Sequence, residues 1–114
     1  HDDAVRAAEQ YGAHPHVTTR PVLLEIGNAL AGIGHRDVAA SYLETIEQES
    51  STEIVPLSTD LFRRGFALYR ERPDKTWGLT DCISFVVMRD RDIRAALTAD
   101  TDFEQAGFRA LLRE

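Results

Sequence analysis

The sequence has little cysteine, no long apolar run and no excess of basic charge. Cys82 is the single cysteine among 114 residues, so no intramolecular disulfide can form and the reducing conditions of the cytoplasm suit the chain. No apolar run approaches the roughly 20 residues that a membrane-spanning helix needs. We therefore expect a cytoplasmic protein that does not act at a membrane.

The net charge of −6 argues against loose, sequence-independent binding of nucleic acid. The basic residues are unevenly placed, since eight of the thirteen lie between Leu61 and Arg94. Acidic residues share that stretch, and we interpret it as a solvated helix face.

Composition and length indicate an ordinary globular protein. The chain is 43% hydrophobic and 28% charged, and it is long enough to bury a core without disulfides. No internal repeat or interdomain linker is visible, so we expect residues 1–114 to form a single domain.

Short apolar or β-branched runs alternate with helical periodicities along the chain. This alternation is typical of a parallel sheet covered by helices on both faces, which places the chain in the α/β class. The predicted helices are 2–11, 20–33, 37–50, 59–72 and 79–88, with a single helical turn at 102–105, and the predicted strands are 17–19, 53–57, 95–99 and 108–112.

The chain is organised around Leu79–Met88, which is apolar on nearly all sides and is therefore expected to be buried. It opens on Thr80 and Asp81, where the free N–H groups and the positive end of the helix dipole lie. A lone aspartate in this place is more often a helix cap than a ligand. Two further acids give Asp81 a second interpretation.

Asp100 stands at the carboxyl end of a predicted strand, where open parallel sheets bind their ligands, and Glu25 lies on a helix that follows a strand. Glu25 can be an ordinary surface residue or a partly buried one that needs a partner. Carboxylates that converge without histidine or thiolate ligands suit Mg²⁺ or Mn²⁺, which can activate water for attack on a phosphoryl centre. His14 and His16 are treated as loop residues.

Three stretches carry a resemblance to a known family: Leu23–Leu30, Trp77–Phe85 and Leu97–Phe108. In content, order and approximate separation they resemble PIN domains, the nuclease fold of VapC-type toxins. The resemblance implies a PIN-like three-layer α/β/α sandwich with a short parallel sheet. It also implies a ribonuclease that depends on Mg²⁺ or Mn²⁺ and cleaves RNA phosphodiester bonds with a metal-activated water.

The resemblance also assigns roles to individual residues. Glu25 matches the family's helix glutamate, Asp81 the aspartate that opens the central helix, and Asp100 the aspartate after the fourth strand. These three would be catalytic and would bind the metal. Asp102 is a weaker candidate for a fourth metal ligand, and Thr80 would orient Asp81 or a metal-bound water.

The sequence departs from the family at its start. PIN domains begin with a strand that ends in a metal-binding aspartate, whereas the printed sequence opens in the helix that follows that strand. Asp2 and Asp3 look like residues of the helix and are not given the role. Either that strand precedes His1 in the natural protein, or the chain is a strandless, impaired relative. We expect the first, with about 15–25 further residues before His1, enough for the strand and a connecting loop, so that residues 1–114 alone would be inactive.

By analogy with the family, the partners would be an RNA substrate, a small protein antitoxin and a second copy of the chain in a homodimer. The alternative function is a non-catalytic PIN scaffold that binds or regulates a partner. A phosphatase using a phospho-aspartate is disfavoured, because the sequence has no aspartate-rich strand end of that kind.

Overall fold

The computed structural model describes Gln10 and residues 14–114, which form two compact units. The first unit is His14–Ser58, and the second contains Thr59–Glu114. The predicted helix 2–11 lies outside the described residues except for Gln10. Each unit is described by itself, and they are called the β1–β2 unit and the α5 unit.

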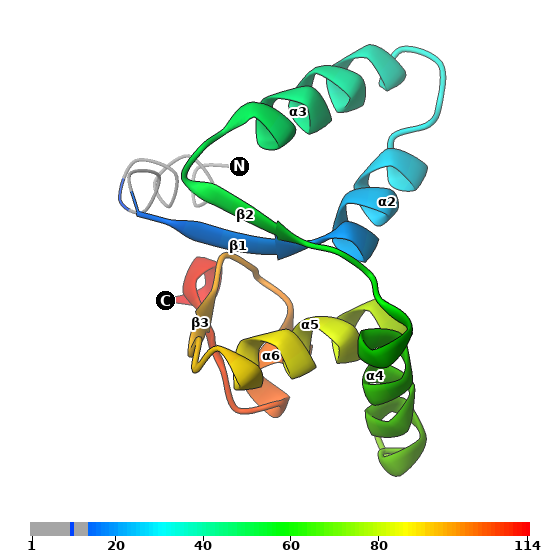
Figure 1. Cartoon of the computed structure of the whole chain (residues 1–114), viewed down its shortest axis with the longest axis vertical. Helices are drawn as coiled ribbons and strands as arrows, with labels where there is room; N and C mark the ends of the chain where they lie inside the picture. Colours follow the sequence, from blue (N-terminus) through cyan, green and yellow to red (C-terminus); the bar gives the residue numbers. More distant parts are fainter. Residues whose placement is uncertain (1–9, 11–13) are drawn as a thin grey trace. The chain divides into compact units, whose positions relative to one another are not determined.

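The β1–β2 unit pairs two parallel strands that are separated in sequence by two helices. Its elements are β1 (His16–Thr19), α2 (Arg20–Ala29), α3 (Arg36–Gln48) and β2 (Thr52–Val55). The strands pair in parallel from His16 opposite Thr52 to Thr19 opposite Val55, and they are drawn blue and green in Figure 1. This confirms the predicted parallel pairing.

Helix α2 begins as predicted but ends earlier. The Thr19 hydroxyl accepts a hydrogen bond from the Val22 N–H at 3.4 Å, which is the expected N-cap. The helix ends at Ala29, so the prediction that it continues to Ile33 is wrong. Ile33 is fully exposed, so a longer helix would gain no stabilising buried contact there. Gly34 has a φ of 91°, which is not a helical conformation.

The α5 unit contains most of the helices. Its elements are α4 (Thr59–Glu71), α5 (Leu79–Asp90), β3 (Ala95–Ala96), α6 (Thr101–Gln105), β4 (Arg109–Ala110) and a 3₁₀ turn at Leu111–Arg113. β3 and β4 pair in parallel, with α6 between them in sequence (Figure 1). The parallel α/β class is therefore confirmed in both units.

Both strands of the α5 unit are shorter than predicted. The run 95–99 was expected to be one buried strand, but β3 stops at Ala96 and Leu97 is 44% exposed. The chain turns because the Thr98 N–H donates to the Ala96 carbonyl at 3.0 Å. The expected strand 108–112 likewise reduces to Arg109–Ala110. This turn after β3 is followed directly by the segment that carries Asp100.

Helix α5 supplies the core of its unit, as its composition predicts. The buried residues of α5 are Cys82, Ile83, Phe85, Val86, Val87 and Met88. The Phe85 ring is fully buried and packs against the rings of Trp77, Phe103 and Phe108, with centroids 5.1, 4.9 and 5.7 Å away. These edge and tilted contacts stabilise beyond the area they bury. Through these contacts, α6 and the loop before α5 both pack against α5.

Helix α4 packs closely on α5 at a glycine. A Cβ atom built on Gly65 would lie 2.5 Å from Ile83 Cγ1 and 3.2 Å from its Cα. An ion pair joins the same two helices, with Arg64 donating to both Asp90 oxygens at 2.5 and 2.7 Å. The Arg64 guanidinium lowers the pKa of the Asp90 carboxyl. Both side chains are nearly half exposed, so the pair contributes little to stability beside the packing at Gly65.

None of the helices in the described part of the chain combines the length and the apolar character needed to cross a membrane.

Candidate metal centre

Asp81 lies in the first turn of α5, where the helix holds its carboxylate in place. Gly78 is the N-cap residue, and its N–H donates to Asp81 Oδ2 at 3.3 Å. The side chain is half-buried. Asp81 therefore caps the helix, as its position predicts, although its hydrogen bond with the Gly78 N–H is long. A carboxylate can accept several hydrogen bonds, so this capping contact does not by itself exclude a role for Asp81 at a cation.

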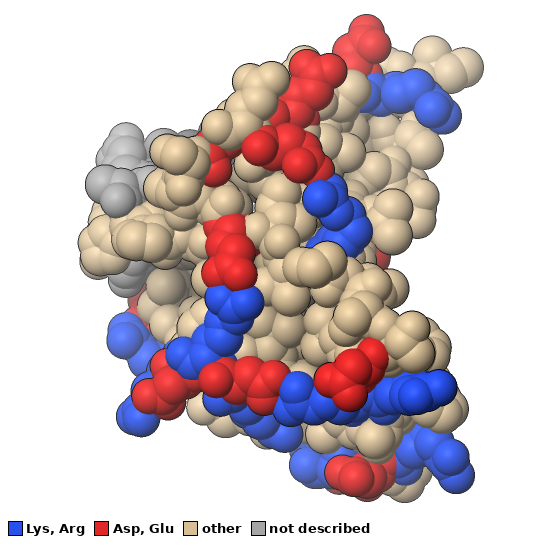
Figure 2. Space-filling model, in the orientation of Figure 1, with Lys and Arg blue, Asp and Glu red and all other residues tan. Residues whose placement is uncertain are grey.

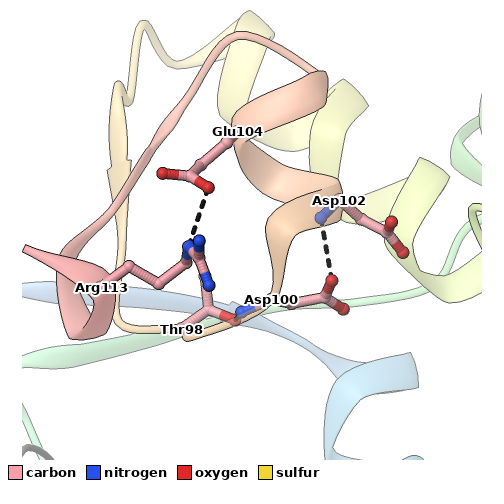
Figure 3. A network of polar contacts seen from close by, with 5 residues as sticks. All are labelled: Thr98, Asp100, Asp102, Glu104 and Arg113. Carbon is pink, nitrogen blue, oxygen red and sulfur yellow. Dashed lines mark hydrogen bonds and ion pairs between the residues drawn. The ribbon is translucent and has the colours of Figure 1, made fainter.

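Asp100 and Asp102 come from the short segment that follows β3. The Asp100 N–H donates to the Thr98 hydroxyl at 3.1 Å, and Asp100 Oδ1 accepts from the Asp102 N–H at 2.9 Å (Figure 3). Asp100 is thus the N-cap of α6, a place that suits aspartate. These local hydrogen bonds fix the backbone at Asp100 and at Asp102, and thereby limit the directions in which the two carboxylates can point.

The three side chains converge. Asp81, Asp100 and Asp102 each offer a carboxylate oxygen, and these oxygens lie within 4.8 Å of one another. We call this group the aspartate cluster. It brings together residues that are about 20 positions apart, from the start of α5 and the start of α6. The sequence analysis ranked Asp102 as a weaker metal ligand than Asp81 and Asp100, but its carboxylate lies as near to theirs as the cluster requires.

Two members of the cluster, Asp100 and Asp102, differ from the nearby Glu104 in their ionic contacts. Glu104, also on α6, accepts a hydrogen bond from Arg113 Nε at 2.8 Å (Figure 3). Asp100 and Asp102 have no such ion pair with any described residue. Like charges at this spacing repel each other, and a bound cation would relieve the repulsion. Three carboxylates without histidine or thiolate donors fit Mg²⁺ or Mn²⁺.

The only cysteine of the chain does not join this donor set. Cys82 follows Asp81 directly, but its side chain is fully buried. Burial, followed by the nearby charge of Asp81, raises the pKa of the Cys82 thiol. The thiol therefore stays neutral near pH 7, whereas a thiolate would be needed as a metal ligand or nucleophile.

Glu25, the other acid singled out in the sequence, lies in the β1–β2 unit on α2. Its side chain is exposed, so of the two interpretations open for it, the buried carboxylate in need of a partner is excluded. Its role at a metal stays a prediction.

Thr98 is a positioning residue that the sequence analysis did not single out. Its hydroxyl holds the Asp100 backbone N–H, and its carbonyl accepts from the Leu112 N–H at 3.1 Å. The signal was present in the spacing, because a threonine two residues before an aspartate is typical of a side-chain-closed turn.

Comparisons with known proteins show the family of the chain. The PIN domain family matches residues 1–109. The crystal structure of Mycobacterium tuberculosis VapC20, a toxin that cleaves the sarcin–ricin loop, is similar with a TM-score of 0.82 and 26% identity. That alignment covers 95% of this chain and 82% of VapC20. No curated protein sequence matches. With almost the whole chain matched, this protein belongs to the PIN domain family.

Proposed function

We propose that this chain is a divalent-metal-dependent ribonuclease of the toxin type, with the aspartate cluster as its metal centre. The observation that carries the proposal is the convergence of three carboxylate oxygens within 4.8 Å of one another. The similarity to VapC20, which cleaves an RNA loop, supports RNA as the substrate. The function rests on the site, since a fold alone does not specify an activity.

The residues of the cluster have distinct tasks in this proposal. Asp100 is held through Oδ1 by the Asp102 N–H, which leaves its other oxygen facing away from that hydrogen bond. Asp81 contributes from the first turn of α5, and Thr98 sets the direction of the Asp100 backbone. A Mg²⁺ or Mn²⁺ ion held there would supply the Lewis acidity that activates water and stabilises charge on the phosphodiester. Without a bound cation, the negative charge of the aspartate cluster would repel the phosphates of RNA.

A separate proposal concerns Glu25 in the β1–β2 unit. The resemblance of Leu23–Leu30 to PIN domains matches it to the glutamate on the family's helix, and its side chain is exposed. We assign it the same metal-binding role as the aspartates.

The assembly that we propose follows the toxin class. A small protein antitoxin would bind the chain and block cleavage, and the active toxin would be a homodimer. The similarity to a VapC toxin supports both, as an analogy at the level of the family.

We expect the purified protein to cleave RNA in Mg²⁺ or Mn²⁺, to be inactive in EDTA, and to recover when Mg²⁺ is returned in excess. A sarcin–ricin loop hairpin and an unstructured RNA of the same length are the two substrates to compare, because VapC20 cleaves that loop. Products are read on a denaturing gel.

Two results would contradict this proposal. A protein that cleaves no RNA and binds no Mn²⁺ would be a non-catalytic scaffold, for which the capping roles of Asp81 and Asp100 are explanation enough. Activity that prefers Zn²⁺ and requires His14 and His16 would exclude an all-oxygen site.

A further inference from the structure

A pocket lies beside the loop that joins α4 to α5, within the α5 unit. It has a volume of about 440 Å³, large enough for a nucleotide unit. Its lining includes Tyr69 and Arg70 from the end of α4, Arg72, Lys75 and Trp77 from the loop, and Cys82 from α5. Among the described residues, no acidic side chain lines it.

The positive charge in the pocket is only partly offset. Arg72 donates to both oxygens of Asp74 at 3.0 and 2.9 Å, and this guanidinium lowers the pKa of Asp74 to about 2. That pair is neutral at pH 7. Arg70 and Lys75, by contrast, form no ion pair with any described carboxylate. Two cations without an ion-pair partner among the described residues therefore line the pocket, although the charge of Lys75 also helps to lower the pKa of Asp74.

Trp77 gives the pocket a rigid wall. It is 4% exposed and packs edge-on against Phe85, while the Arg72 guanidinium and the Lys75 ammonium lie over its ring at 5.2 and 5.9 Å. Cations over an aromatic face are held in position by the ring quadrupole. Arg70 is placed in the same way, over the Phe66 ring at 5.7 Å. The pocket therefore presents pre-oriented basic groups.

The pocket adjoins the aspartate cluster through the start of α5. Cys82 lines the pocket, and Asp81 is the residue directly before it. Trp77 and Asp81 are four residues apart, which limits their Cα separation to about 15 Å. Both sites belong to one unit, and Phe85 packs against Trp77 on one side and Phe103, next to Asp102, on the other. One nucleic-acid strand can reach both.

The distribution of charge supports a local rather than a general attraction to RNA. Residues 59–114 contain ten basic and ten acidic residues, and the two signs are interspersed on the face of the α5 unit that Figure 2 shows. Such a surface has no net electrostatic attraction for a polyanion. Affinity for RNA must then come from sites where cations are not held in ion pairs, and arginine and lysine are the residues that bind phosphate.

We propose that this pocket binds a backbone phosphate of the RNA substrate near the scissile bond, with Arg70 and Lys75 as its charged ligands. The proposal rests on the ribonuclease function proposed above for the identity of the ligand. It adds a substrate-binding site outside the metal centre, which would hold the strand against the repulsion of the aspartates.

The test compares two double variants with the same change in net charge. Arg70→Gln/Lys75→Gln removes the pocket cations, and Arg89→Gln/Arg94→Gln removes two cations at and beyond the opposite end of α5. Binding of a fluorescent single-stranded RNA is measured by anisotropy in EDTA over a series of salt concentrations. Because EDTA removes divalent ions, this binding is measured whether or not the protein cleaves RNA.

We expect the pocket variant to bind RNA at least about tenfold more weakly, since hydrogen bonds to charged groups are lost. The slope of log K against log salt should fall by about 0.7, the value for one phosphate contact on a single strand. The control variant should change neither quantity by a comparable amount. In cleavage assays the pocket variant should raise KM more than it lowers kcat.

Equal losses in the two variants would overturn the proposal, as would an intact protein that binds no RNA. Inorganic phosphate should compete only at millimolar concentration, because it offers one contact where the strand offers several. If free phosphate displaces RNA at micromolar concentration, or if an acidic peptide binds the pocket and RNA does not, the pocket serves another ligand. RNA binding that depends on the pocket without any cleavage would refute the ribonuclease and leave the pocket assignment standing.

Discussion

Replacing Asp100 by asparagine is expected to lower RNA cleavage at least roughly 100-fold, the upper end of what loss of even an outer-shell partner of a metal costs. The free energy of unfolding without metal should stay equal or rise. One of three mutually repelling charges is removed, while asparagine remains a good N-cap and can still accept the hydrogen bond from the Asp102 N–H. Cleavage rates and urea unfolding in EDTA give the two quantities.

Glu104→Gln is the matched control for this change. Glu104 lies on the same short helix and has the same charge as Asp100, but it pairs with Arg113 and is outside the aspartate cluster. Both members of that pair are nearly half exposed, so its loss should alter stability by less than about 1 kcal/mol and leave cleavage intact. If Asp100→Asn retained full activity, Asp100 would be a helix cap and nothing more. The same comparison applies to Asp81→Asn.

Replacing Gly65 by alanine is expected to destabilise the protein by about 1–3 kcal/mol, the usual cost of forcing an extra carbon into a packed core. Alanine favours the helix by about 1 kcal/mol, so the packing strain must exceed that gain. It should, because the new Cβ would meet both the side chain and the backbone of Ile83, with its Cα at 3.2 Å. Urea unfolding monitored by circular dichroism measures the loss.

Gly27→Ala provides the opposite expectation in another helix. Its added Cβ would lie 3.7 Å from Leu43 Cδ1, an ordinary contact. The gain in helix propensity, up to about 1 kcal/mol, should then appear as increased stability. A Gly65→Ala variant as stable as Gly27→Ala would show that α4 and α5 do not pack as closely as described here.

The sequence predicted the elements of the fold well where periodicity was long. Helix α5 was recognised from an apolar run whose burial the structure confirms, and the parallel pairing followed from the order of strands and helices. The strand ends were predicted less well. β3 ends at Ala96 in a turn where the Thr98 N–H donates to the Ala96 carbonyl, and β4 ends at Ala110 before a 3₁₀ turn. Hydropathy does not report these local hydrogen bonds.

The candidate site was predictable in its residue types more than in its geometry. Asp81 and Asp100 could be chosen because a helix start and a strand end are places where ligands bind. Asp102 could not be ranked beside them, because its place in the cluster depends on how α6 begins. The basic pocket was not predicted, since the arginines around it read as an ordinary solvated helix face.

The measurement that tests the central claim most directly is a titration of Mn²⁺ into the metal-free protein by isothermal titration calorimetry. We expect saturable binding of Mn²⁺ with a raised melting temperature, because an ion that binds only the folded state stabilises it by mass action. Asp100→Asn should weaken this binding at least roughly tenfold, while Asp74→Asn, a carboxylate outside the cluster, should not change it. Equal affinity for Mn²⁺ in the parent and in Asp100→Asn would contradict the assignment of the aspartate cluster as a metal centre.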